Sequence, residues 1–199
     1  VGTAVTNNTF INNGAITLSA SGTQGVYAKV GADATNNGNI TITSGNSFGM
    51  YIEGTGFNKT TSTNPDAGTN AVGYNLLGVG IRYIGFAPGA TGTNNGNIII
   101  NTTSTGAIGM SALHSDTTTT NTSTGNIQIT GKQSMGMLST ANSGTTTNNG
   151  LIQINANSDE SIGLASSLGG GTTVNNNKII VDSNLAYGAR AMASSITNS

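Results

Sequence analysis

The sequence predicts an all-β protein, a right-handed parallel β-helix, and three observations support this prediction. A short pattern recurs along the chain, apolar residues alternate with polar ones inside each copy, and charged side chains are rare. Charged residues make up 7% of the 199 residues, whereas globular domains typically carry roughly 25%. A solenoid, in which each coil buries its apolar face only against its neighbours, is the architecture that fits such a repeat.

The first part of the repeat is a corner followed by a short strand. Residues 36–42 read Asn-Asn-Gly-Asn-Ile-Thr-Ile, with polar Thr41 between Ile40 and Ile42. This period of two is typical of a strand with one buried face. Because Asn and Gly accept positive φ angles, we expect them to turn the chain at the corner. The same plan recurs at residues 12–18, 94–100, 123–129, 148–154 and 175–181.

Stacked coils would bring equivalent polar residues into columns. We expect the corner asparagines to form a ladder of amide hydrogen bonds, as in cross-β assemblies. The threonine runs just ahead of the corners should stack in the same way; they are Thr117 to Thr120, Thr145 to Thr147, and Thr172 with Thr173.

The second part of the repeat is a strand built around a glycine. Phe48-Gly49-Met50-Tyr51-Ile52 is one copy, in which we expect Phe48, Met50 and Ile52 to face inward. Essentially no α-helix is expected, because Gly, Asn and Thr are poor helix formers. The glycines predict about seven coils of 24–31 residues, counted at Gly25, Gly49, Gly80, Gly109, Gly136, Gly163 and Gly188.

One stretch departs from the repeat. We interpret residues 1–199 as a single β-helix segment of a longer protein, and residues 53–93 as an irregular or inserted coil with loops. Both prolines, Pro65 and Pro88, lie in this stretch. Irregular loops on a rigid scaffold often carry binding residues, which makes this stretch a candidate recognition region.

An aromatic and cationic strip is the candidate binding surface. Residues two positions after each second-block glycine should form an outward column, with neighbours ~4.8 Å apart. Exposed aromatic rings stack on sugars or anchor protein partners; the alternative is that these rings only cap an irregular coil. The first three residues of this column are Tyr27, Tyr51 and Arg82. The full candidate set for binding is Tyr27, Tyr51, Phe57, Tyr74, Arg82, Tyr83 and Phe86.

Residues suited to catalysis or metal binding are few. Asp159 and Glu160 are the only adjacent acids, and neighbours in sequence usually point apart, whereas paired-carboxylate catalysis needs two converging acids. His114 is the only histidine, and cysteine is absent. We therefore expect no enzymatic activity, no metal and no cofactor.

Charge and hydropathy also limit the partners. The formal net charge of -1 leaves no electrostatic footprint for nucleic acid. No stretch approaches the ~20 apolar residues of a membrane-spanning helix. Membrane association is therefore expected only through an anchor outside this chain.

The repeat resembles a known family. Asn36 to Ile42, followed by Ser47-Phe48-Gly49-Met50, is similar to the passenger repeats of large fusobacterial autotransporter adhesins of the RadD type. The similarity covers nearly the whole chain. It implies type V secretion, display of a β-helical stalk at the outer membrane, and attachment to a protein or glycan receptor on host cells or other bacteria, a role in virulence.

Two other functions are known for β-helices of related composition. An ice-binding, Thr-rich β-helix would need a regular Thr-x-Thr face, but the first-block position of Thr41 is held elsewhere by Ile99, Gln128 or Gln153. A phage tail-spike or other polysaccharide-acting β-helix would need grouped acids, which the sequence does not show.

Overall fold

The structure is a computed structural model. It describes residues 8–29, 32–53, 90–101, 105–113, 117–140, 145–167, 172–192 and 194–199, and the backbone of residues 71–74 and 81–84. Every regular element in these ranges is a β-strand, as the sequence predicts. Phe57, Phe86 and His114 lie outside the described residues.

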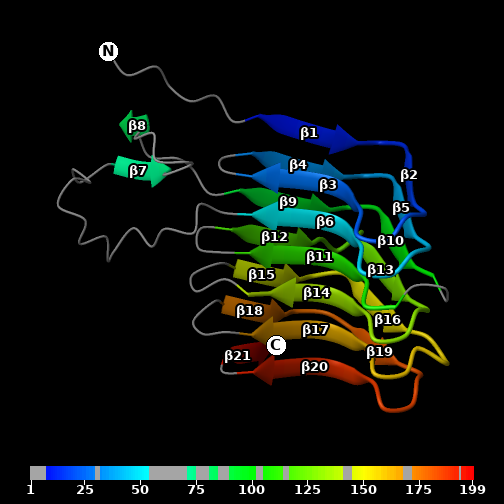
Figure 1. Ribbon diagram of the computed structural model, residues 1–199. Helices are drawn as coiled ribbons and strands as arrows, with labels where there is room; N and C mark the ends of the chain where they lie inside the picture. The colour runs from blue at the N-terminus through cyan, green and yellow to red at the C-terminus, as the bar shows by residue number, and fades with distance from the viewer. Residues whose placement is uncertain are drawn as a thin grey trace.

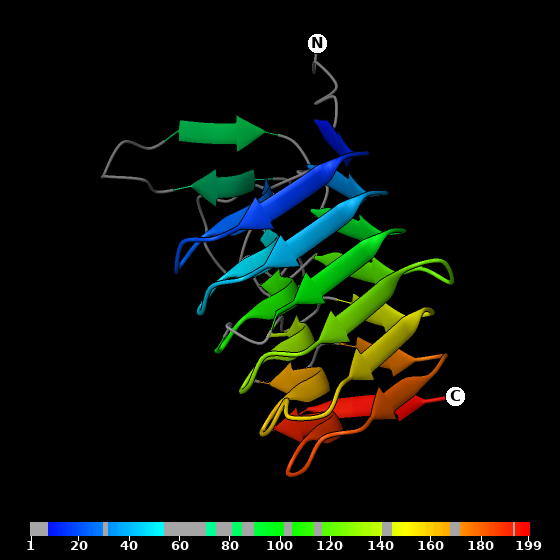
Figure 2. The ribbon, with the colours of Figure 1, turned by 90° about the vertical axis from the view of Figure 1, so that its right-hand side faces the viewer.

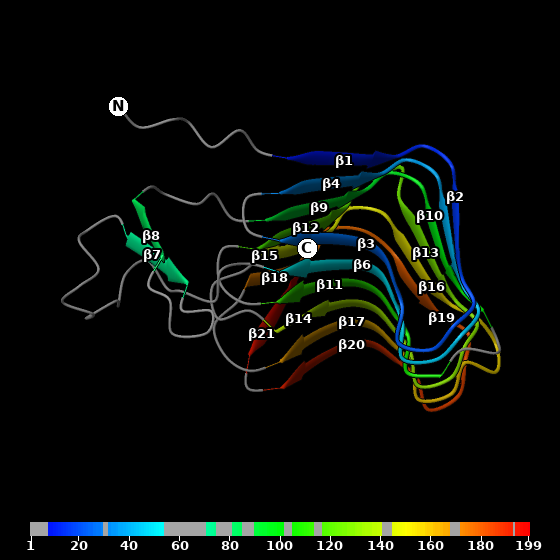
Figure 3. The same cartoon turned by 45° about the horizontal axis from the view of Figure 1, so that its top comes forward.

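Three parallel sheets form the walls of a solenoid (Figures 1 and 3). Sheet A contains β1 (Thr9–Asn12), β4 (Asp33–Asn36), β9 (Thr91–Asn94), β12 (Thr118–Asn121), β15 (Thr145–Asn148), β18 (Thr172–Asn175) and β21 (Ser195–Asn198). Sheet B contains β2 (Ala15–Leu18), β5 (Asn39–Ile42), β10 (Asn97–Ile100), β13 (Asn126–Ile129), β16 (Leu151–Ile154) and β19 (Ile179–Val181). Sheet C contains β3 (Gln24–Lys29), β6 (Phe48–Glu53), β11 (Ile108–Leu113), β14 (Met135–Ser139), β17 (Ile162–Ser167) and β20 (Tyr187–Met192).

The chain visits sheets A, B and C in turn and then starts the next coil. In each sheet the strands follow one another in chain order, with parallel pairing, and the stack is visible along one wall in Figure 2. Equivalent residues of the repeat lie side by side, for example Ile98 between Ile40 and Ile127. The parallel β-helix prediction is therefore confirmed.

The predicted number of coils is wrong at one place. β6 pairs directly with β11, so that Tyr51 lies opposite Ser111 and no coil at Gly80 stands between them. The described strands β7 (Ala71–Tyr74) and β8 (Ile81–Ile84) instead pair antiparallel with each other. A strand that pairs in a local hairpin closes a much shorter loop than a strand that stacks on the neighbouring coil. The hairpin therefore costs less chain entropy. Six strand triplets result, followed by β21.

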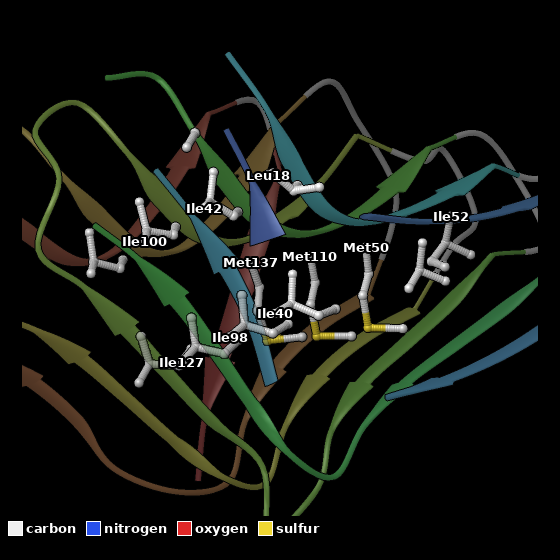
Figure 4. Packing of buried hydrophobic residues seen from close by; sticks show 14 of the residues in the cluster. Leu18, Ile40, Ile42, Met50, Ile52, Ile98, Ile100, Met110, Ile127 and Met137 are labelled. Atoms are coloured by element: carbon white, nitrogen blue, oxygen red, sulfur yellow. The ribbon is translucent and has the colours of Figure 1, made fainter. Parts of the chain in front are cut away.

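The core is built mainly from sheets B and C. From β5 to β16 each strand of sheet B contributes two buried apolar residues, such as Ile98 and Ile100, and sheet C contributes a column of methionines. Figure 4 shows Met50, Met110 and Met137 beside the isoleucines of sheet B. Burial of one such side chain is worth about 1.5–3 kcal/mol, so the stacked columns supply the main driving force.

The expected inward position of Phe48 is wrong. Gly49 and Met50 are both buried, which breaks the alternation at the start of β6. The ring of Phe48 consequently packs on the outer face, with its centroid 4.9 Å from that of Tyr51. The inward pattern resumes with Met50 and Ile52.

The corner between sheets A and B holds the predicted asparagine ladder. Each Nδ2 donates to the Oδ1 of the asparagine in the next coil over 2.7–2.8 Å. Several of these amides also donate to a backbone carbonyl two residues further on. The ladder runs through Asn12, Asn36, Asn94, Asn121, Asn148, Asn175 and Asn198.

The expectation of positive φ at these corners is wrong. Gly38 is needed there for a different reason, since a Cβ on it would collide with the carbonyl oxygen of Gly14. The left-handed residues lie instead at the corner before sheet C, two positions ahead of each strand. They are Gly22, Asn46, Gly106, Gln133, Glu160 and Leu185, and Asn157 lies in the same corner but further from its strand.

Removal of one ladder amide should destabilise the fold. Asn148→Ala leaves the Oδ1 of Asn175 without a partner and leaves the Nδ2 of Asn121 with only a long bond of 3.4 Å to the Leu151 carbonyl. Each unsatisfied buried group costs about 1–3 kcal/mol. We expect the urea midpoint to fall by the equivalent of about 2–4 kcal/mol. The neighbouring, more exposed Asn149→Ala is the control, and an equal loss in both variants would contradict the special role of the buried ladder.

The second-block glycines should also resist substitution. A Cβ on Gly136 would lie 2.6 Å from the carbonyl oxygen of Gly163 in the next coil. Gly136→Ala should therefore cost about 1–3 kcal/mol through overpacking, measured by thermal unfolding. Gly14→Ala is the matched control, because its nearest atom is 4.0 Å away. Equal melting temperatures for both variants would refute the close-approach explanation.

Candidate functional site

Three rings form an aromatic cluster on the outer face of sheet C, consisting of Tyr27, Phe48 and Tyr51. The register of β3 and β6 places Tyr27 directly opposite Tyr51. Their ring centroids are 5.4 Å apart and tilted by 58°, and Phe48 meets Tyr51 edge-on at 88°. Such tilted and edge-to-face pairs are favourable aromatic geometries. Tyr27 remains 50% exposed, so the cluster presents a ring to solvent.

A charged pair borders the aromatic cluster. The Tyr27 hydroxyl donates to Oε2 of Glu53 over 2.6 Å, and Lys29 Nζ lies 3.2 Å from Oε1 of the same carboxylate. The pairing of Lys29 with Glu53 follows from the same β3–β6 register. A partly exposed ion pair contributes little to stability, but here it fixes the tip of the Tyr27 ring and surrounds it with donors and acceptors.

The environment raises the pKa of both tyrosines. For Tyr27, burial raises the pKa most, followed by the hydrogen bond to Glu53 and the negative charge of Glu53, while Lys29 partly offsets them. For Tyr51, burial again comes first, and the charge of Glu53 adds to it. Both phenols are therefore neutral near pH 7, which keeps their hydroxyl groups available as donors.

The structure brings together only part of the candidate set. Tyr27 and Tyr51 are adjacent, but Arg82 is not next in their column, because Ser111 takes the position opposite Tyr51. The backbone of Arg82, Tyr83 and Tyr74 belongs to the β7–β8 hairpin, and their side chains lie outside the described part, as do Phe57 and Phe86.

Sequence reasoning missed three members of this surface. Phe48 was assigned to the core, and Glu53 and Lys29 were not linked to the tyrosines. Lys29 and Glu53 occupy the same position of two successive second-block strands, so their pairing was recoverable from the repeat alone.

The same column continues with smaller residues towards the C-terminal coils. Ser111, Leu138, Ala165 and Arg190 follow Tyr51 in register. Arg190 places its guanidinium carbon 5.7 Å from the centre of the Tyr187 ring, a cation–π distance. Two ring-bearing patches therefore stand on sheet C. The prediction that the whole column faces outward is wrong between them, because Ser111 and Ala165 are buried.

Both adjacent acids are engaged by side chains of the preceding coil. Gln133 Nε2 donates to Oε2 of Glu160 over 2.7 Å, and Lys132 Nζ lies 3.3 Å from Oδ2 of Asp159. Among the residues that the structure describes, no three His, Cys, Asp or Glu side chains group to hold a metal ion. Nor does any described segment form a helix able to cross a membrane.

The chain is a parallel β-solenoid, the class that the stacked sheets and the repeat define. No protein-family model, curated protein or solved structure matches it. Its function therefore has to be argued from its own surfaces.

The link between Glu53 and Tyr27 can be tested by titration. Glu53→Gln should lower the pKa of Tyr27 towards its ordinary value, because it removes a negative charge that disfavours the phenolate. Ultraviolet titration of each protein, corrected with the corresponding Tyr27→Phe variant, measures this. Glu160→Gln is the control. An unchanged Tyr27 titration in Glu53→Gln would contradict the contact.

The direction of the pH effect on stability follows from the raised tyrosine pKa values. A group whose pKa is higher in the folded chain stabilises it below the ordinary pKa, and that contribution is lost as the pH rises through the folded-state value. The tyrosines of the aromatic cluster should therefore weaken the fold at alkaline pH, and Tyr27→Phe should reduce this loss in urea unfolding.

Proposed function

We propose that this chain is a structural and adhesive segment of a secreted autotransporter adhesin displayed at the bacterial outer membrane. The observation that carries the proposal is the aromatic cluster, a half-exposed ring with fixed polar neighbours on the side of a solenoid. The repeat that resembles autotransporter passenger domains extends through the whole stack, and the cluster lies within it.

The architecture suits a stalk. Each coil adds one strand spacing of ~4.8 Å to the length, and each is stabilised by its immediate neighbours. The chain has no cysteine, so its coils are held by apolar burial and hydrogen bonds without disulfides. Such a rod can be built coil by coil after export and projects its side walls to the surroundings.

The chemistry of the aromatic cluster favours a glycan or protein receptor. The apolar face of a sugar ring stacks on an exposed tyrosine, while the Glu53 carboxylate and the Lys29 ammonium can bond to the hydroxyl groups of the sugar. A shallow surface of this size binds weakly as a single copy, and many copies on one cell raise the avidity. We propose no catalytic role for it.

Binding to glycan arrays and to host or bacterial cells tests this function. The double variant Tyr27→Ala/Tyr51→Ala should lose binding by about 2 kcal/mol, or roughly 30-fold, as central aromatic contacts do. The matched control is Gln128→Ala/Gln153→Ala, which removes two stacked outward residues from sheet B. Circular dichroism confirms that each variant is folded.

Two results would count against the proposal. Unchanged binding by the folded aromatic variant would place recognition elsewhere on the chain. Absence of binding by the unaltered protein would make this segment a spacer that holds another part of the adhesin away from the cell.

A further inference from the structure

The outer face of sheet A carries a second ordered surface. In the middle strands of this sheet, from β4 to β18, the first and third residues point outward, while the second and fourth point inward and are buried. The outward positions form two columns, which we name the threonine lattice. It consists of Thr91, Thr118, Thr145 and Thr172 in one column, and Thr35, Thr93, Thr120 and Thr147 in the other.

The threonine lattice repeats in two directions. Thr118 lies directly between Thr91 and Thr145, and Thr120 lies between Thr93 and Thr147. The strand spacing sets a repeat of about 4.8 Å along the solenoid, and two residues of one strand set a repeat of about 6.7 Å across it. Threonine is stiff at χ1, so methyl and hydroxyl groups repeat at the same intervals.

Neighbouring contacts hold this register in place. The asparagine that ends each strand is part of the buried ladder, and on the inward face the hydroxyls of Thr119 and Thr146 are 3.1 Å apart. A strand of sheet A therefore cannot slide against the next one without breaking buried hydrogen bonds. The outward threonines of the same strands are therefore held in the same register.

The hydroxyls in the middle of the lattice make no hydrogen bond within the described part of the protein. Within the described part of the chain, those of Thr118, Thr120, Thr145 and Thr147 have no protein partner, whereas corner residues such as Thr130 bond to backbone carbonyls. At the N-terminal end, the Thr91 hydroxyl donates to Asp33, and this pair ends one column. From β12 to β15 the outward face of sheet A is free of charged side chains.

Such a surface suits a ligand that itself repeats. A small molecule would meet only one or two of the identical positions, whereas a crystalline lattice of donors and acceptors meets all of them together. The oxygen spacings of hexagonal ice are close to the two repeats of this lattice. Crystalline polysaccharide is the less favoured partner, because stacking on sugar rings uses aromatic side chains, and those lie on sheet C.

We propose that the threonine lattice of sheet A binds ice. Methyl groups order the adjacent water, and the unoccupied hydroxyls anchor it at lattice positions. This function goes beyond adhesion and uses a different wall of the solenoid. The broken first-block series, with Thr41, Ile99 and Gln128, belongs to sheet B; the regular Thr-x-Thr series lies one sheet earlier in each coil.

An ice recrystallisation assay and thermal hysteresis test this proposal. The unaltered protein should slow grain growth and lower the freezing point below the melting point. Thr120→Tyr, at the centre of the lattice, should lose most of both activities because the larger ring interrupts the flat array. Gln128→Tyr, on sheet B of the same coil, should keep them. Circular dichroism and thermal melting show whether each variant folds.

Three outcomes would overturn the proposal. Grain growth equal to that in an unrelated protein of the same concentration would exclude ice binding, and so would full activity in a folded Thr120→Tyr variant. Retention on crystalline cellulose or chitin without any effect on ice would assign the face to polysaccharide. Because these assays contain no cells, their failure is independent of the adhesive role of the aromatic cluster.

Discussion

The structure depends on the in-register stacking that the asparagine ladder enforces. A buried amide has to satisfy both its donor and its acceptor, and each asparagine meets this need only when the equivalent residue of the next coil is directly opposite. A slip by one residue would leave these amide groups without hydrogen-bond partners and would turn the Ile columns towards solvent. Apolar burial drives the coils together, whereas the ladder selects one register.

Fixed register also converts a linear repeat into surfaces. Residues at one position of the repeat become a column, and two alternate positions become a face, so the chemistry of each wall is set by one short stretch of the motif. The interval between β6 and β9 shows how strongly this holds. Asn36 and Asn94 are 58 residues apart and still bond as ladder neighbours, because the cost of a longer loop grows slowly with its length.

Much of the fold could be predicted because the repeat carries local physical signals. Sheet B was indicated by the alternating Ile residues, and sheet C by the glycine-centred strands. The ladder was indicated by the corner asparagines. The coil count failed because the sequence Val79-Gly80-Ile81-Arg82-Tyr83 fits the second block, whereas β8 pairs with β7 in a local hairpin. Loop closure, not composition, decides between the two. The left-handed corner was missed because Gln133, Glu160 and Leu185 carry no glycine-like signal there; the fold imposes a conformation that costs about 1–2 kcal/mol.

The candidate surfaces were less predictable than the fold because they depend on which coils are neighbours. Tyr27 and Tyr51 stack whichever coil follows, but the place predicted for Arg82 required a coil between β6 and β11, and these two strands pair directly. The threonine runs were recognised as stacking, yet their division into buried and outward columns required the third wall to be identified. Small inward residues complete that wall: a Cβ on Gly92 would lie 2.5 Å from Ile52, so sheet A packs closely on the core. Close packing inside and uniform threonines outside thus both follow from the alternation of inward and outward residues in sheet A. A substitution on the outer face can therefore alter recognition while the core remains intact.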